Sequence, residues 1–227
     1  MDSRKELILK ILIQEHIKTG TPVGSGVLVE KYNLDISPAT ARNELAWLES
    51  EGYIIQPHTS AGRVPTEKAY NLFLEQFSNS KLSKQITDHF CSVLQNTDEQ
   101  SLKETAKVTA RISDGAVFCA FHRNNLYYTG ISNLFQQPEF NELSLIHDIS
   151  TVIDRMDEVI DSIFDEIDIG VHTLIGSKNP FGNFCSVIIS KHRTEDNVGL
   201  FGVLGPMRMD YKKNIALIKY INKKISN

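Results

Sequence analysis

The sequence has few cysteines and lacks the spacings typical of a disulfide framework or a zinc site. Its three cysteines, Cys91, Cys119 and Cys185, lie far apart and form no Cys-x-x-Cys pair. We expect them to be buried, reduced thiols of a cytoplasmic protein. The seven histidines show no His-x-x-x-His or Glu-x-x-His spacing. The sequence therefore predicts no metal site and no cofactor.

Long apolar runs are also missing. No stretch approaches the roughly 18 uninterrupted apolar residues that a membrane helix requires. The segment Met1 to Lys10 contains Asp2 and Glu6 and has no apolar core, so it does not read as a signal peptide. We expect a cytoplasmic protein without a membrane partner.

A surplus of positive charge is absent as well. The formal net charge is −4, and residues 1–77 hold 8 Lys and Arg against 10 Asp and Glu. Nucleic-acid binding must then depend on where a few cations are placed, not on bulk charge. No Gly-x-Ser-x-Gly elbow or glycine-rich phosphate loop is present either, and we expect a protein that is not an enzyme.

The first 50 residues contain signals for three short helices. An amphipathic pattern follows the capping-box sequence Ser3-x-x-Glu6 and ends at Gly20, which predicts a helix over 3–19. Ser25 can cap a second helix over 25–32. Ser37-Pro38 marks the start of a third helix over 37–50, before Gly52. Helices joined in this way by a tight turn are typical of a helix-turn-helix.

A hairpin is predicted directly after the third helix. Residues 53–56 and 63–65 can form two short strands, and the polar segment 57–62 can form the turn between them. A two-stranded hairpin after a recognition helix is the wing of a winged helix. We therefore interpret residues 1–77 as a winged-helix DNA-binding domain.

The rest of the chain has the pattern of an α+β domain. Helices are expected over 66–77 and 80–113, with a break at Asn96-Thr97-Asp98, and residues 78–113 are interpreted as a helical linker. Further helices are expected over 138–165 and 210–225, and strands over 116–122, 126–131, 169–176, 183–190 and 198–204. This order favours an antiparallel sheet with segregated helices over 114–227.

Two groups of polar residues are candidates for DNA contacts. On the third helix Thr40, Arg42 and Asn43 lie away from the apolar side; Arg can donate to guanine and Asn to adenine, while hydroxyls suit phosphates. The hairpin turn offers a second group. The alternative is that both groups are ordinary solvated surface, which spacing alone leaves open. The full candidate set is Ser25, Ser37, Thr40, Arg42, Asn43, His58, Thr59, Ser60 and Arg63.

Two stretches of the sequence together resemble the HrcA heat-shock repressors. The N-terminal run Gly20-Thr21-Pro22-Val23-Gly24-Ser25 and the segment from Gln56 to Pro65 are similar to the family's DNA-binding domain and wing. Near the C-terminus, the segment Gly202 to Tyr211 is similar to a second family signature. The resemblance covers nearly the whole chain.

The resemblance implies a repressor of chaperone operons. Members of the family bind an inverted-repeat operator in double-stranded DNA as homodimers, depend on the GroE-type chaperonin to stay active, and combine a winged helix with a GAF-like domain. Two departures are visible. Family members exceed 300 residues and usually carry an inserted dimerisation domain, most or all of which is missing from this chain. Gly26 stands where the family commonly has Arg.

Alternatives remain for the C-terminal half. Arg208, Asp210 and Tyr211 are interpreted as a possible dimer or regulatory contact, with Asp210 able to cap the last helix; a small-ligand site there is the alternative. A GAF-like fold also permits a regulator that responds to a small metabolite and not to chaperonin.

Overall fold

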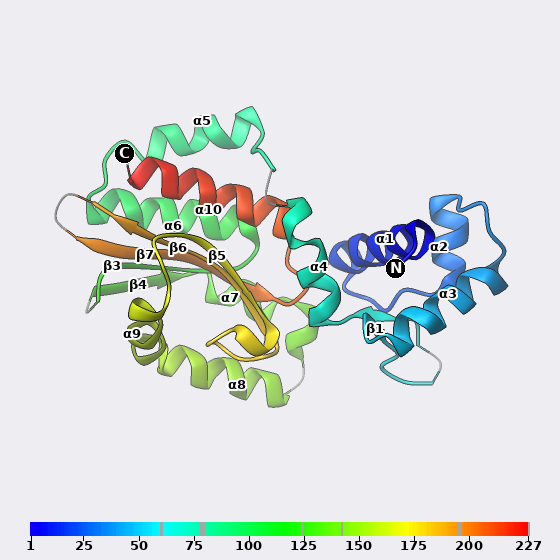
Figure 1. Ribbon diagram of the computed structural model, residues 1–227. Coiled ribbons are helices and arrows are strands. Elements are labelled where there is room, and N and C mark those ends of the chain that lie inside the picture. Colours follow the sequence, from blue (N-terminus) through cyan, green and yellow to red (C-terminus); the bar gives the residue numbers. More distant parts are fainter. Residues whose placement is uncertain (60, 78–79, 124, 142, 195–196, 227) are drawn as a thin grey trace. The chain divides into compact units, whose positions relative to one another are not determined.

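Figure 1 shows a computed structural model of the chain, which describes residues 1–59, 61–77, 80–123, 125–141, 143–194 and 197–226. The chain divides into two compact units, Met1–Gln76 and Phe77–Asn227. Within the described ranges, no helix is both long enough and apolar enough to cross a membrane.

The first unit contains the predicted helices and hairpin in the predicted order. The elements are α1 (Ser3–Thr19), α2 (Ser25–Tyr32), α3 (Pro38–Ser50), β1 (Ile54–Ile55), β2 (Val64–Pro65) and α4 (Glu67–Phe77). Its core is formed by the apolar stripe of each helix, including Ile8, Leu12, Leu28, Leu45 and Phe73, all of which are buried.

The helix starts differ in part from the prediction. The N-cap of α1 is Asp2, whose carboxylate accepts from the backbone N–H groups of Arg4 and Lys5, so the expected capping box on Ser3 is wrong. Gly24 is the N-cap of α2 and no side chain caps that helix, so the expected cap on Ser25 is also wrong. Ser37 caps α3 as predicted, accepting from Thr40 N at 3.1 Å.

The hairpin is joined to the loop between α1 and α2. Ile54 pairs with Pro65 and Ile55 with Val64, and Val23 forms a bridge with Arg63 through two backbone hydrogen bonds of 2.8 Å each. A Cβ at Gly62 would stand 2.5 Å from the carbonyl carbon of Val23. Only glycine therefore permits the hairpin to approach the loop this closely.

The second unit is an α+β structure built on an antiparallel sheet, as predicted. Among the described residues the sheet has five strands in the order β4-β3-β7-β6-β5. The strands are β3 (Ala116–His122), β4 (Asn125–Thr129), β5 (Gly170–Ile175), β6 (Cys185–Arg193) and β7 (Val198–Pro206). Each expected strand is present, with ends that differ by a few residues.

Helices cover both faces of this sheet (Figure 1). One face carries α5 (Lys84–Val93), α6 (Glu99–Ser113) and α10 (Tyr211–Ile225). The other carries α7 (Ile131–Phe135), α8 (Leu143–Asp154) and α9 (Met156–Glu166). The segment expected as a linker, 78–113, thus lies within the second unit, and its predicted break is real: Asp98 caps α6 by accepting from Ser101 N at 2.8 Å.

The helix expected over 138–165 is not continuous. It consists of a 3-10 turn, Pro138–Asn141, followed by α8 and α9, which are separated at Arg155. Helix α7 and a second 3-10 turn, Gly176–Lys178, were not expected. The apolar periodicity runs through the break, because α8 and α9 both present apolar residues to the sheet.

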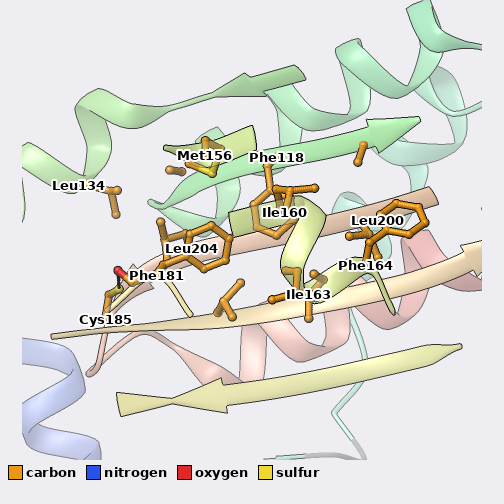
Figure 2. Close-up of a cluster of buried hydrophobic side chains, with 14 of the residues drawn as sticks. Phe118, Leu134, Met156, Ile160, Ile163, Phe164, Phe181, Cys185, Leu200 and Leu204 are labelled. Carbon is orange, nitrogen blue, oxygen red and sulfur yellow. Dashed lines mark hydrogen bonds between the residues drawn. The ribbon is translucent and has the colours of Figure 1, made fainter. Parts of the chain in front are cut away.

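A hydrophobic core lies between the sheet and α8 and α9 (Figure 2). Alternate strand residues such as Phe118, Val187 and Leu200 meet Met156 and Ile160 of α9 there. The rings of Phe118 and Phe181 lie 5.4 Å apart. Alternation of side chains along each strand leaves the opposite set for α6 and α10.

The cysteines follow the prediction only in part. All three are free thiols; Cys119 and Cys185 are buried, and burial raises the pKa of each to about 12. Cys91 is exposed, so the expectation of a buried thiol is wrong there; its Sγ lies 3.1 Å from Tyr220 Oη. Cys91 lies on the amphipathic surface helix α5. Residue type alone does not show whether an apolar side chain on such a helix faces the core or the solvent.

Candidate nucleic-acid interface

The N-terminal half of α3 presents the polar residues that the sequence singled out. Leu45 and Leu48 point into the core, while Arg42 and Asn43 are exposed. Ser37 Oγ and Thr40 Oγ1 lie 2.9 Å apart at the helix start. Ser37 at the N-cap and Thr40, Arg42 and Asn43 in the first two turns therefore lie together at the start of one helix.

Arg42 is one of the cations of this unit that have no carboxylate partner among the described residues. Among the described residues, Arg42, Lys10 and Lys18 form no ion pair or side-chain hydrogen bond, and only Arg42 is on α3. The unit's other cations are engaged: Arg4, Lys5, Lys31 and Arg63 in ion pairs, and Lys68 with the carbonyl of Glu51 at 2.7 Å. The guanidinium of Arg42 is thus available to an external anion or base.

Acidic side chains of the unit hold four of its cations, Arg4, Lys5, Lys31 and Arg63, in place. Glu44 accepts from Arg4 at 3.5 Å and from Lys5 at 3.2 Å. Hydrogen bonds to Asp2 and then to Glu44 raise the pKa of Lys5. Glu15 is buried and pairs with Lys31 at 2.5 Å and with the hydroxyl of Tyr32 at 2.6 Å.

This pairing keeps Glu15 charged inside the unit. The bonds from Lys31 and then Tyr32 lower the pKa of Glu15, and its carboxylate raises the pKa of Tyr32 to about 12. Glu15 therefore ties α1 to the C-terminal end of α2.

The hairpin turn is held from inside by Gln56. Its side-chain amide donates to the carbonyl oxygens of Thr59 at 3.0 Å and Ala61 at 2.9 Å, and Ala61 N donates to His58 O at 2.9 Å. His58 and Thr59 are exposed at the turn. Ser60, the other candidate of this turn, lies outside the described residues.

Arg63 was expected at the tip of the hairpin, but it lies at the base. Its Nε donates to Glu49 Oε2 at 3.0 Å, and its side chain is only 19% exposed. Glu49 Oε1 also accepts from Gln56 N at 3.0 Å. Arg63 is therefore engaged within the unit, where it links the hairpin to α3.

Ser25, the remaining candidate, is the first residue of α2 and is half-buried. Gly26 follows it in open space, where an added Cβ would meet only Glu30 Oε1 at 4.0 Å. The start of α2 thus has room for a larger side chain at position 26.

The second group of candidates forms contacts within its own unit. Arg208 pairs with both carboxylate oxygens of Glu139 and donates to Gln137 Oε1 at 2.9 Å. Asp210 caps α10 as expected, accepting from Lys213 N at 3.0 Å. Tyr211 is fully buried, with its Oη bonded to Ser186 Oγ at 2.8 Å and to Met207 O at 2.5 Å. Because Tyr211 is buried, it offers no surface for a dimer or regulatory contact.

Sequence reasoning missed Glu49, Gln56 and Glu44, which organise the unit. Each is a common polar residue with no motif of its own. Gln56 immediately precedes the predicted turn and Arg63 immediately follows it. These flanking positions were the one signal in the sequence for side chains that hold the hairpin turn.

Comparison with known families relates the chain to one family. Residues 50–215 match the family described as HrcA protein C terminal domain. The heat-inducible transcription repressor HrcA of Carboxydothermus hydrogenoformans is 26% identical over 333 positions, covering 100% of this chain and 97% of the relative. The repressor of the same name from Acidothermus cellulolyticus is 41% identical over 117 residues, 50% of this chain and 34% of the relative.

The first of these alignments also bears on length. Its 333 positions exceed the 227 residues of this chain, so part of the relative stands opposite gaps. A solved structure described only as a hypothetical protein matches with a TM-score of 0.80 and 16% identity, covering 100% of this chain and 98% of that one. At this identity the likeness shows a shared fold.

Proposed function

The chain belongs to the HrcA family, and on that premise we propose that it is a transcription repressor of heat-shock operons, binding an inverted-repeat operator as a homodimer. Its relatives are named heat-inducible transcription repressors. No catalytic step is part of this function, since a repressor acts by occupying promoter DNA.

We assign the DNA-binding role to the first unit, interpreted as a winged helix-turn-helix. Helix α3 is the recognition helix that enters the major groove, and its first turns carry Arg42 and Asn43 to base edges. Ser37, Thr40 and Ser25 are placed to meet phosphates. The observation that carries this proposal is the exposed guanidinium of Arg42 on α3, which has no partner among the described residues.

The hairpin β1–β2 is the proposed wing. His58, Thr59 and Ser60 are its proposed DNA contacts, with Gln56 fixing the turn by two hydrogen bonds. Arg63 serves this contact indirectly: in its bond to Glu49 it sets the angle between wing and α3. A rigid hairpin lowers the entropy cost of binding, because the turn does not have to order on the DNA.

The second unit is the proposed GAF-like regulatory and dimerisation domain. Two-fold symmetry of the dimer would be matched by the inverted repeat of the operator, with one recognition helix in each half-site. A GroE-type chaperonin is the proposed modulator, releasing repression when unfolded clients compete for it. In the absence of the family's insert, the dimer contact falls to this unit.

The proposal is tested by titrating an inverted-repeat heat-shock operator with the full chain and its Arg42→Ala variant. Loss of a bidentate contact to guanine costs about 1–3 kcal/mol, so specific affinity should fall about 5- to 150-fold per half-site while circular dichroism is unchanged. Lys10→Ala is the matched control, because Lys10 is also exposed and unpaired among the described residues but lies on α1.

Equal losses in the two variants would assign binding to general charge and refute the role of Arg42. Adding chaperonin to the same titration tests the modulator: tighter operator binding supports it, and an unchanged titration contradicts it. Sedimentation of the free chain at micromolar concentration tests the dimer.

A further inference from the structure

The second unit contains a cavity that the DNA-binding role does not use. It has a volume of about 190 Å³ and lies at the N-terminal end of α6, against the ends of β3, β6 and β7. Its lining residues are Thr97, Asp98, Glu99, Leu102, Phe121, His122, His192, Thr194, Asn197 and Gly199. Both polar and apolar groups therefore face it, as in sites for small organic ligands.

One side chain of the cavity wall has an unsatisfied polar atom. His192 is 2% exposed, and its Nδ1 forms no hydrogen bond among the described residues. Gly199 makes room for this ring, since a Cβ at position 199 would stand 2.7 Å from Nε2. A buried nitrogen without a partner costs free energy, so a partner brought by a ligand would recover it.

The charged groups around the cavity determine which sign of charge the ligand should carry. The lining includes the carboxylates of Asp98 and Glu99 and contains no Lys or Arg among the described residues. Hydrogen bonds from the start of α6 lower the pKa of Asp98, which stays ionised. Burial lowers the pKa of His192 to about 4, so this ring carries no positive charge at pH 7 and its Nδ1 can accept.

The chain itself places an ammonium group at the rim. Lys103 Nζ lies 3.4 Å from Glu99 Oε2 and 5.3 Å from the centroid of the Phe121 ring. Carboxylate and aromatic face together are the surroundings that favour ammonium groups. Lys103 neutralises Glu99, which leaves Asp98 as the carboxylate available to a ligand.

We propose that this cavity binds a small organic cation with protonated amino groups, one donating to His192 Nδ1 and one facing Asp98. The acceptor nitrogen of His192 and the carboxylate of Asp98 each call for a donor or a cation, whereas an anion would be repelled by Asp98. The site is separate from the proposed DNA-binding residues, all of which belong to the first unit.

The test is a titration of the full chain with 1,4-diaminobutane at fixed ionic strength, followed by calorimetry and by imidazole resonances of His192. Succinate, of equal length and opposite charge, is the matched probe. We expect saturable binding of the diamine that shifts the His192 resonances, and none of succinate. Removing a hydrogen bond to a charged donor in His192→Phe should weaken binding at least about tenfold.

Asp98→Asn keeps the helix cap and removes the charge, so it tests the site without disturbing the fold. Its expected effect is about two- to fivefold weaker binding. Asp210→Asn, the same change at the N-cap of α10 outside the cavity, should leave binding unchanged. Equal weakening in both variants, preferential succinate binding, or no saturable binding of the diamine would overturn the proposal.

Discussion

Two residues of α3 have opposite roles although they stand only two turns apart. Arg42 is exposed and unpaired among the described residues, whereas Glu49 accepts from Arg63 Nε and Gln56 N, each at 3.0 Å. Glu49 pairs with Arg63, a cation next to the candidate interface. This pairing lowers the electrostatic attraction of the surface for any DNA. Specific binding then depends on few cations, in keeping with the slight acidic balance of residues 1–77.

Glu49→Gln should therefore increase non-specific DNA binding. The change removes a negative charge and releases the Arg63 guanidinium, so the slope of log K against log salt on non-operator DNA should steepen by about 1 to 2. The control is Glu51→Gln, which removes a charge two residues away but forms no ion pair among the described residues. If both variants steepen the slope equally, the release of Arg63 contributes nothing.

The thiols provide a second prediction at this scale. Cys91 is exposed, whereas burial raises the pKa of Cys119 and Cys185 to about 12. The reactive species is the thiolate, so iodoacetamide at pH 8 should label Cys91 alone in the native protein. Mass spectrometry of tryptic peptides identifies the site, and Cys91→Ser should abolish labelling. Native labelling of Cys185 would show that the core around it opens.

At the scale of elements, the hairpin is stabilised more by its neighbours than by its own strands. Each strand is two residues long, which is too little for stability in water. Its support comes from the Val23 bridge, the Glu49 bonds and the Gln56 clamp. The hairpin, α3 and the loop after α1 are therefore held together as one rigid substructure.

Gly62→Ala should disrupt the packing of the hairpin against the loop after α1. The added Cβ would lie 2.5 Å from Val23 C and 2.7 Å from Pro22 C, both backbone atoms. Such overpacking costs about 1–3 kcal/mol, measurable as a lowered urea midpoint of the first unit. Gly26→Ala, in the open space of α2, should instead stabilise it by about 0.5 kcal/mol. A neutral Gly62→Ala would mean that hairpin and loop separate without cost.

At the scale of the whole molecule, the proposed DNA contacts and the buried titratable histidine belong to different units. The first unit carries the proposed DNA contacts, and the second has a five-stranded sheet with helices on both faces (Figure 1). A buried neutral histidine in that sheet makes the stability of the protein depend on pH. The unfolded chain takes up a proton on His192 near pH 6.5, but the folded chain does so only near pH 4.

The sign of this dependence follows directly. Stabilisation from His192 is complete above pH 6.5 and is lost as the pH falls toward 4, because the unfolded state then binds the extra proton. The loss amounts to about 3 kcal/mol at most. Urea unfolding at a series of pH values should show it, and His192→Phe should flatten the curve. His147→Gln, at a histidine whose side chain is 82% exposed, should not change it.

Much of the element order was predictable because it depends on local signals. Ser37-Pro38, Asp98 and Asp210 start helices through bonds within a few residues, and alternation located the strands of the sheet. The break at Arg155 was not predictable, since apolar periodicity runs through it. Arg63 was expected at a free turn, but its partner Glu49 lies 14 residues away on another element.

The sequence by itself determined the helices and hairpin of the first unit, the five strands of the second, the α+β class and the family, because caps, periodicity and motif residues are local or linear properties. It also placed Arg42 and Asn43 on the polar face of a helix. Only the tertiary structure decided which cations remain unpaired, that Tyr211 is buried, and that His192, Asp98 and Phe121 line one cavity. The reason is physical: burial and pairing depend on residues brought together across the fold, and residue type alone does not say which partners those will be.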